Sequence, residues 1–252
     1  MKKVQTKTFV KKLSSTDRKI RDHAFETLKQ YLGERSDVRP LKLNEFEKLW
    51  EGLYYTMWFS DRPRPQQKLA NDLANLFSET ITKQQFCLFV QAFWAVICKE
   101  WPEIDQWRVD KFYLLMRYVI RECFVRLQEN SWEEELVDQY VHVLESQVLS
   151  GKTSIPNGVT YHVIDVYLDE LERTVVGEDE EDVQEKFKDV PLEKLLQPFK
   201  KLETGALMKT LRLKVRDDVS RDERLQKWGY VESVTEKQPE NDDEEEEWTG
   251  FD

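Results

Sequence analysis

Helical periodicity is the feature that most constrains this chain. From residue 15 to about residue 175, apolar residues recur at intervals of three and four, and no segment alternates strictly between apolar and polar residues. Intervals of three and four place apolar side chains on one face of an α-helix, whereas strict alternation indicates a half-buried strand. The sequence therefore predicts an all-α fold.

The composition favours the same fold class. Glycine and proline number only 8 each in 252 residues, whereas β-sandwiches need frequent turn residues and nucleotide-binding α/β folds need glycine-rich loops. The longest run without a charged residue is residues 84–98, which is shorter than the roughly 20 residues that span a bilayer. The first residues lack an apolar signal-peptide core, and the three cysteines form no C-x-x-C pair. We therefore expect an intracellular protein with reduced thiols and no membrane partner.

Capping residues and helix breakers divide the periodic region into separate helices. Gly33 is expected to end the first helix. Capping boxes that begin at Asn44, Thr82 and Ser131 are expected to open three later helices. Pro65 suits the first position of the next helix, because a proline there gives up no intrahelical hydrogen bond.

Helices of this length, joined by short turns, are expected to pack antiparallel as pairs in a curved stack that resembles HEAT repeats. No fixed sequence period is visible, so such an array would be degenerate. The predicted organisation is a basic N-terminal segment (1–14), a helical repeat-like domain (15–176), an acidic linker (177–190), a region of short helices (191–234) and a disordered acidic tail (235–252).

The charge is distributed unevenly along the chain. The net charge is −11, but acidic residues concentrate in residues 178–185 and 231–252, and the remainder is mildly basic. The overall acidity therefore does not argue against a partner such as RNA.

Motifs of catalysis are missing from the sequence. Its three histidines are widely spaced, and it contains no H-E-x-x-H, Walker A, G-x-G-x-x-G or G-x-S-x-G motif. We therefore expect no catalytic residues, no metal site, no cofactor and no small-molecule substrate.

One segment, residues 48–73, combines prolines with basic residues. Residues that precede proline are disfavoured in the helical region, so Arg62 and Arg64 are expected in an extended loop between two helices. With Lys68 one turn into the next helix, they could bind phosphates. The alternative is a rigid helix connector in which Arg62 pairs with Asp61 or another nearby carboxylate.

Other basic residues are further candidates for RNA contact. These are Lys2, Lys3, Lys7, Lys11 and Lys12 near the N-terminus, and Lys209, Arg212, Lys214 and Arg216 in a late basic stripe. Five tryptophans follow apolar helical spacing, so we expect them to pack in the core and turns instead of stacking on bases: Trp50, Trp58, Trp94, Trp101 and Trp107.

The C-terminal tail carries a different candidate. Six consecutive carboxylates at residues 242–247 precede Trp248 and Phe251. These two aromatic residues are candidates for docking on a partner while the carboxylates meet its basic surface. The alternative is a solvated end whose aromatic residues make no contact.

Four segments of this sequence carry a resemblance to a known family. They are KLWEGLYYTMWFSDRPRPQQKLANDL (48–73), EWPEIDQWRVDKFYLLMRYVIRECF (100–124), PNGVTYHVIDVYLDEL (156–171) and LEKLLQPFKKL (192–202). In this order and register they closely resemble the nucleolar ribosomal RNA processing protein 1 family, also called the Nop52 family. The resemblance covers about residues 7 to 202.

The resemblance implies a function as well as a HEAT-like helical fold. It implies a non-enzymatic assembly factor of the early large (60S) ribosomal subunit precursor, in the nucleolus of the nucleus. The implied partners are large-subunit pre-rRNA in preribosomal particles and other assembly factors, among them Brix-domain and WD40-propeller proteins. Functions tied to the long basic C-terminal extension of animal members are not carried over.

Three functions are therefore compared. The leading hypothesis is a helical scaffold that docks pre-rRNA and neighbouring proteins during large-subunit assembly. The alternative is a HEAT-like adaptor that binds proteins only, without direct RNA contact. A weaker third hypothesis is an RNA-modifying enzyme without known motifs.

Overall fold

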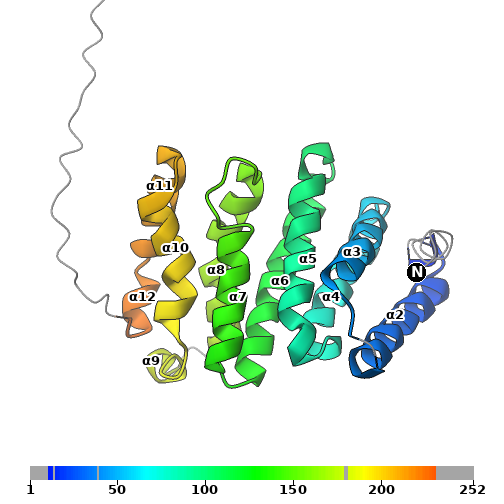
Figure 1. The fold of residues 1–252 in the computed structure, drawn as a ribbon, viewed down its shortest axis with the longest axis horizontal. Coiled ribbons are helices and arrows are strands. Elements are labelled where there is room, and N and C mark those ends of the chain that lie inside the picture. Colours follow the sequence, from blue (N-terminus) through cyan, green and yellow to red (C-terminus); the bar gives the residue numbers. More distant parts are fainter. Residues whose placement is uncertain (1–10, 14, 39, 179–180, 231–252) are drawn as a thin grey trace, which may run out of the picture.

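Helices make up all the regular structure in the described part of the chain (Figure 1). The computed structural model describes residues 11–13, 15–38, 40–178 and 181–230. No strand occurs among these residues, so the all-α prediction is confirmed. The α-helices are α2 (Arg18–Val38), α3 (Leu43–Trp58), α4 (Pro63–Asn75), α5 (Lys83–Glu100), α6 (Val109–Glu129), α7 (Glu134–Ser146), α8 (Asn157–Val176), α9 (Val183–Lys186), α10 (Leu192–Gly205), α11 (Lys209–Val215) and α12 (Arg224–Lys227). Shorter segments are the π-helical η1 (Leu76–Thr80) and η3 (Arg216–Ser220) and the 3₁₀ helix η2 (Trp101–Glu103).

The helices alternate between two layers of a stack. In one layer α3 packs on α5, α5 on α7 and α7 on α10, and in the other α4 packs on α6 and α6 on α8. The pairs follow one another from α2 at the right of Figure 1 to α11 and α12 at the left. This arrangement confirms the predicted HEAT-like stack of helix pairs, in which each pair contacts mainly its neighbours.

Aromatic rings pack both within each layer and between the two layers of the core. The ring centroid of Trp50 lies 4.9 Å from that of Phe93, and Tyr54 stacks on Phe112 with centroids 4.7 Å apart. Further along, Tyr167 lies 4.9 Å from Phe124 and 4.7 Å from Phe199. The apolar faces of successive helices therefore form one continuous core.

Several helix ends differ from the sequence-based predictions. Gly33 lies inside α2 and does not end it, because a glycine in a helix costs only about 1 kcal/mol. The predicted box at Asn44 is wrong, since α3 begins at Leu43 and the Glu45 carboxylate accepts a hydrogen bond from the Lys42 amide. The helix after the proline segment begins at Pro63, two residues earlier than predicted. Amides of a first helical turn have no intrahelical acceptor, so α4 tolerates both of its prolines there.

Two further capping predictions are wrong in their chemistry. Thr82 directly precedes α5, but its side chain makes no capping hydrogen bond. The side-chain amide of Gln85 donates to the Leu41 carbonyl instead of the N-cap backbone. Ser131 and Trp132 adopt positive φ angles in the turn between α6 and α7, so α7 begins only at Glu134.

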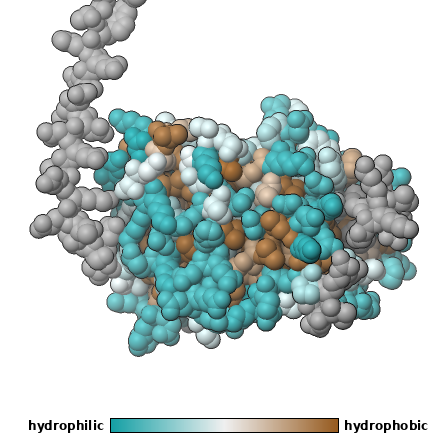
Figure 2. Space-filling view, viewed as in Figure 1, coloured by the Kyte–Doolittle hydropathy of each residue, from teal (hydrophilic) through white to brown (hydrophobic). Residues whose placement is uncertain are grey.

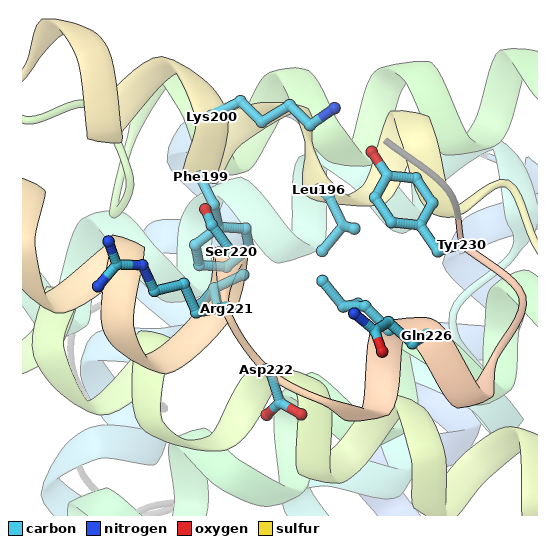
Figure 3. A pocket seen from close by; sticks show the side chains of 10 residues that line it. Leu196, Phe199, Lys200, Ser220, Arg221, Asp222, Gln226 and Tyr230 are labelled. Carbon is cyan, nitrogen blue, oxygen red and sulfur yellow. The ribbon is translucent and has the colours of Figure 1, made fainter. Parts of the chain in front are cut away.

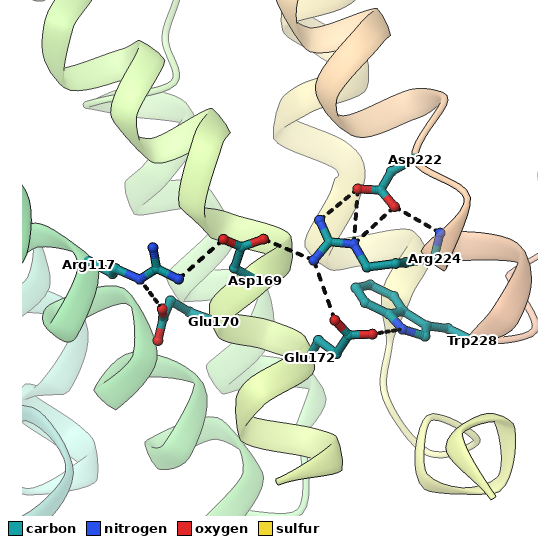
Figure 4. A network of polar contacts seen from close by, with 7 residues as sticks. All are labelled: Arg117, Asp169, Glu170, Glu172, Asp222, Arg224 and Trp228. Carbon is teal, nitrogen blue, oxygen red and sulfur yellow. Dashed lines mark hydrogen bonds and ion pairs between the residues drawn. The ribbon is translucent and has the colours of Figure 1, made fainter. Parts of the chain in front are cut away.

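The C-terminal helices are tied to the rest of the stack by a polar network (Figure 4). Arg224 bonds to Asp222 and reaches Asp169 on α8 at 2.9 Å. Glu172 of α8 accepts a hydrogen bond from the Trp228 indole at 3.2 Å, and the Trp228 ring stacks on Phe187. The short helix α9 lies within the segment that was expected to be an acidic linker. The predicted disordered tail, 235–252, lies outside the described residues.

Candidate nucleic-acid interface

The turn between α3 and α4 positions two of the predicted arginines. Arg62 is extended, with φ −88° and ψ 128°, as the residue before Pro63 was expected to be. Arg64 lies in the first turn of α4, so the extended loop predicted for it is wrong. Pro65 borders a small cavity with Leu13 and residues of α2. This packing outweighs the preference of Arg64, as the residue before a proline, for an extended backbone.

A buried lysine holds this turn in place. Lys111 of α6 is 4% exposed and donates hydrogen bonds to the carbonyls of Trp58 at 2.7 Å and Ser60 at 3.0 Å. Its ammonium lies 3.6 Å from the Asp61 carboxylate, and burial lowers the pKa of Lys111. Asp61 therefore faces Lys111 and does not pair with Arg62, which was the sequence-based alternative.

The two arginines of the turn point into solvent. Arg62 and Arg64 are exposed, and neither side chain forms an ion pair or a hydrogen bond with any described residue. Lys68 is different, because it is 2.5 Å from Asp72 and 3.5 Å from Asp22. Of the three residues proposed for this segment, two are thus available for phosphates and the third is already paired.

The fold places the N-terminal basic residues beside this turn. Leu13, three residues of α2 and the start of α4 surround the same small cavity. Lys11 and Lys12 directly precede Leu13 and are exposed, and an Arg18–Asp22–Lys68 chain of ion pairs joins α2 to α4. We call this surface the basic end of the stack and define it by Lys11, Lys12, Arg18, Arg21, Arg62, Arg64 and Lys68.

The basic end carries an excess of positive charge. Its seven basic residues face four acidic ones, Asp17, Asp22, Asp61 and Asp72. The candidates Lys2, Lys3 and Lys7 lie outside the described residues. Arginine and lysine side chains grouped in this way are the usual ligands of nucleic-acid phosphates.

The late basic stripe lies at the opposite end of the stack and is differently arranged. Lys214 lies between Asp165 at 2.5 Å and Asp218 at 2.6 Å. Arg212 donates to the Ala206 carbonyl at 2.7 Å, and Arg216 lies 3.8 Å from Glu203. Lys209 is exposed on the first turn of α11. The structure does not bring this stripe to the basic end, and Arg212, Lys214 and Arg216 are engaged in contacts within the fold.

The tryptophans do not all pack as predicted. Trp50 and Trp94 are buried, and Trp58 and Trp101 are partly buried against the core. Trp107 is 84% exposed, so the prediction that it packs in a turn is wrong. It precedes α6 by two residues, where helical periodicity does not assign a residue to a face.

Exposed apolar residues elsewhere were also missed. Phe59 is 59% exposed at the end of α3, and Leu207 is 79% exposed between α10 and α11. Figure 2, viewed from the same side as Figure 1, shows polar residues over the lower part of the molecule and apolar patches between them in the middle and upper part.

The described residues contain no arrangement typical of a catalytic centre. None of them forms a group of three His, Cys, Asp or Glu suited to a metal. Burial raises the pKa of both the Cys87 and Cys98 thiols to about 12, so these thiols are not reactive nucleophiles. No described helix is both long and apolar enough to cross a membrane.

One cavity, of about 200 Å³, lies between α10, η3 and α12 (Figure 3). Its Ser220 hydroxyl donates to Glu203 at 2.6 Å, and its Asp222 carboxylate is bound by Arg224. These two polar groups are thus engaged in structural contacts, and the lining residues include no paired nucleophile and base.

Comparison with known proteins gives one family. The sequence profile of the Nop52 family, described as "Nucleolar protein, Nop52", matches residues 4–250. The chain is 40% identical over 171 residues to ribosomal RNA processing protein 1 homolog B of Mus musculus, covering 67% of this chain and 23% of that protein. It is 35% identical over 171 residues to homolog A of Homo sapiens, covering 67% and 37%. It is 32% identical over 171 residues to the Drosophila melanogaster homolog, covering 67% and 25%. The chain therefore spans less than two fifths of the length of these relatives.

Proposed function

The chain belongs to the Nop52 family, and from this premise we propose that it is a non-enzymatic factor in ribosomal RNA processing. The observation that carries the proposal is the similarity to several ribosomal RNA processing protein 1 homologues, at 35–40% identity for the mammalian relatives cited. More specifically, the protein acts as a helical scaffold in the nucleolus that docks pre-rRNA within precursors of the large (60S) subunit.

The basic end supports direct contact with RNA. Arg62 and Arg64 are exposed and form no ion pair or hydrogen bond with the described residues, and Lys11 and Lys12 precede Leu13, which borders the same small cavity as Pro65 of α4. Electrostatic contact with phosphates releases bound counterions, so such binding weakens as salt rises. A stack of helix pairs also offers a long surface along which RNA and proteins can dock together.

The proposed protein partners are other large-subunit assembly factors, including Brix-domain and WD40-propeller proteins. Trp248 and Phe251, outside the described residues, remain our candidates for docking such a partner. A stack of helix pairs presents an extended surface that protein partners alone could occupy. This observation keeps a protein-only adaptor as the second candidate function.

Replacement of the endogenous protein in cells tests the proposal. Cells depleted of it should accumulate large-subunit RNA precursors and lose 60S subunits, and the wild-type chain should restore both. The double variant Arg62→Glu, Arg64→Glu should fold normally but restore processing poorly, because reversed charges repel phosphates.

A matched control reverses two exposed cations at a distance from the basic end, Lys152→Glu with Arg173→Glu, and should restore processing fully. Normal precursor processing after complete depletion would contradict the proposed function. Crosslinking of the wild-type chain in cells separates the two candidates, because a protein-only adaptor would yield no crosslinked pre-rRNA.

A further inference from the structure

Two aromatic residues lie on adjoining turns beside the basic end. Phe59 ends α3, and Trp107 precedes α6. The hydrogen bonds from Lys111 to the Trp58 and Ser60 carbonyls join these turns. The Arg108 guanidinium also lies 4.7 Å from the centroid of the Trp58 ring. The residues that follow Trp58 and precede Arg108 are therefore neighbours in space.

The backbone at Trp107 is firmly held while its indole is open to solvent. The Trp107 amide donates to the Asp105 carboxylate at 3.0 Å, and the Asp105 carbonyl accepts hydrogen bonds from the Arg108 and Val109 amides at 3.1 Å. The Arg108 side chain also bonds to the Asp105 carboxylate. The indole is 84% exposed and makes no side-chain hydrogen bond or ring contact with the described residues. The fold therefore holds the backbone at Trp107 and leaves its ring accessible to a ligand.

Phe59 is presented in a similar way next to the free arginines. It is 59% exposed, and its ring stacks on one side only, against Tyr55, with centroids 6.5 Å apart. Arg62 and Arg64 follow within five residues and are unpaired among the described residues. An open ring and two unpaired guanidinium groups therefore follow one another in the segment from the end of α3 to the first turn of α4.

We propose that these two turns bind unpaired RNA, with bases stacking on the rings of Trp107 and Phe59 while Arg62 and Arg64 contact the phosphates. This inference rests on the proposed function and names the form of RNA that the surface recognises. Proteins that bind single strands combine a positive surface with aromatic side chains on which bases stack. The bases of a duplex are already stacked and paired, so they do not reach such rings.

The surroundings favour RNA over a protein partner at this surface. Charged side chains of Asp61, Arg62, Asp105 and Arg108 flank the two rings in sequence. The core of a protein interface is instead depleted of charged residues and forms a continuous apolar patch. Separate rings beside the unpaired cations Arg62 and Arg64 suit nucleotides, whose bases are apolar on their faces and whose phosphates are anionic.

Fluorescence anisotropy with the full chain tests this inference. The probes are a fluorescein-labelled, unstructured 20-nucleotide pyrimidine RNA and a duplex of the same length. Trp107→Ala should weaken binding of the single strand about tenfold, because stacking of one base on an aromatic ring contributes roughly 1–3 kcal/mol and 1.4 kcal/mol is tenfold. Trp107→Phe, which keeps a ring, should retain most of the affinity, and duplex binding should not change.

Leu207→Ala is the matched control, since it removes an equally exposed apolar side chain from another turn of the stack. It should leave both affinities unchanged. All variants should melt at the wild-type temperature, because the replaced side chains are exposed.

The possible failures are distinguishable. If Trp107→Ala binds the single strand as the wild type does while Arg62→Glu, Arg64→Glu loses it, the stacking inference is wrong and the RNA scaffold stands. If the wild type binds neither probe, both the stacking inference and the proposed direct contact with RNA are wrong. If Trp107→Ala binds RNA normally but loses a protein on purification from cells, the surface is a protein-docking site and the inference is overturned.

Discussion

Truncation of Phe112 to alanine should remove a large part of the stability of the fold. The Phe112 ring is fully buried and stacks on Tyr54 at 4.7 Å, between helices of the two layers. Removing a buried phenylalanine costs about 3–5 kcal/mol because contacts are lost and a cavity is left. The aromatic pair adds about 0.5–1.5 kcal/mol, so we expect a loss in the upper half of that range.

Trp58 is the matched comparison. It was also predicted to lie in the core, but it is only partly buried, and its ring is covered on one side by Arg108. Since less apolar area leaves water, Trp58→Ala should cost only about 1–2 kcal/mol.

Urea denaturation followed by circular dichroism measures both changes as shifts of the midpoint at a constant slope. Helix should dominate the spectrum of each variant. A cost below about 1 kcal/mol for Phe112→Ala, or equal costs for the two variants, would refute the assignment of the core.

Two further predictions concern the polar contacts that hold the stack. Lys111→Met should lower the free energy of unfolding by about 2–3 kcal/mol. Each hydrogen bond from a charged donor contributes about 1.5–3 kcal/mol, and removing the buried ammonium charge offsets part of that loss. Unchanged stability in urea would contradict this role of Lys111. Arg224→Met should cost about 2 kcal/mol at pH 7, since it removes the cation that faces Asp222 and Glu172 and leaves Asp169 with Arg117 alone. Burial raises the pKa of Asp222, but the Arg224 bonds outweigh burial and hold it below 3.8. The contribution of this pair is therefore complete only well above the ordinary aspartate pKa of 3.8 and is lost as the pH falls through and below that value, so the difference in melting temperature between wild type and Arg224→Met should shrink toward pH 3. An equal difference at pH 7 and at pH 3 would contradict the assignment.

The sequence predicted the fold well because helical periodicity is local. Phe112 and Phe124 follow this periodicity along α6, and both are buried. Helix ends were predicted less well, because tertiary packing decides whether Gly33 or Pro65 interrupts a helix. Trp107 was misplaced because it precedes the first helical residue, so periodicity did not apply to it.

The candidate site could be predicted only in part, because charge in a sequence does not reveal pairing in space. Lys214 lies 49 residues from its partner Asp165, and Lys111 lies about 50 residues from the turn that it holds. The same limit hid the proximity of Leu13, which follows Lys12, to Pro65 at the start of α4. The proline pattern did predict the extended backbone of Arg62, since that effect depends only on the next residue.

The two ends of the stack differ in how far their cationic side chains are paired with carboxylates. This difference predicts which end of the stack faces RNA. At the C-terminal end, Lys214, Arg216 and Arg224 each face carboxylates of the fold. Residues 231–252, which follow this end in the sequence, are strongly acidic and would repel phosphates. At the basic end, cations exceed carboxylates, and Arg62 and Arg64 make no side-chain contacts with the described residues. Because unpaired cations gain most from contact with phosphates, RNA should approach the N-terminal half of the stack and leave the C-terminal half to protein partners.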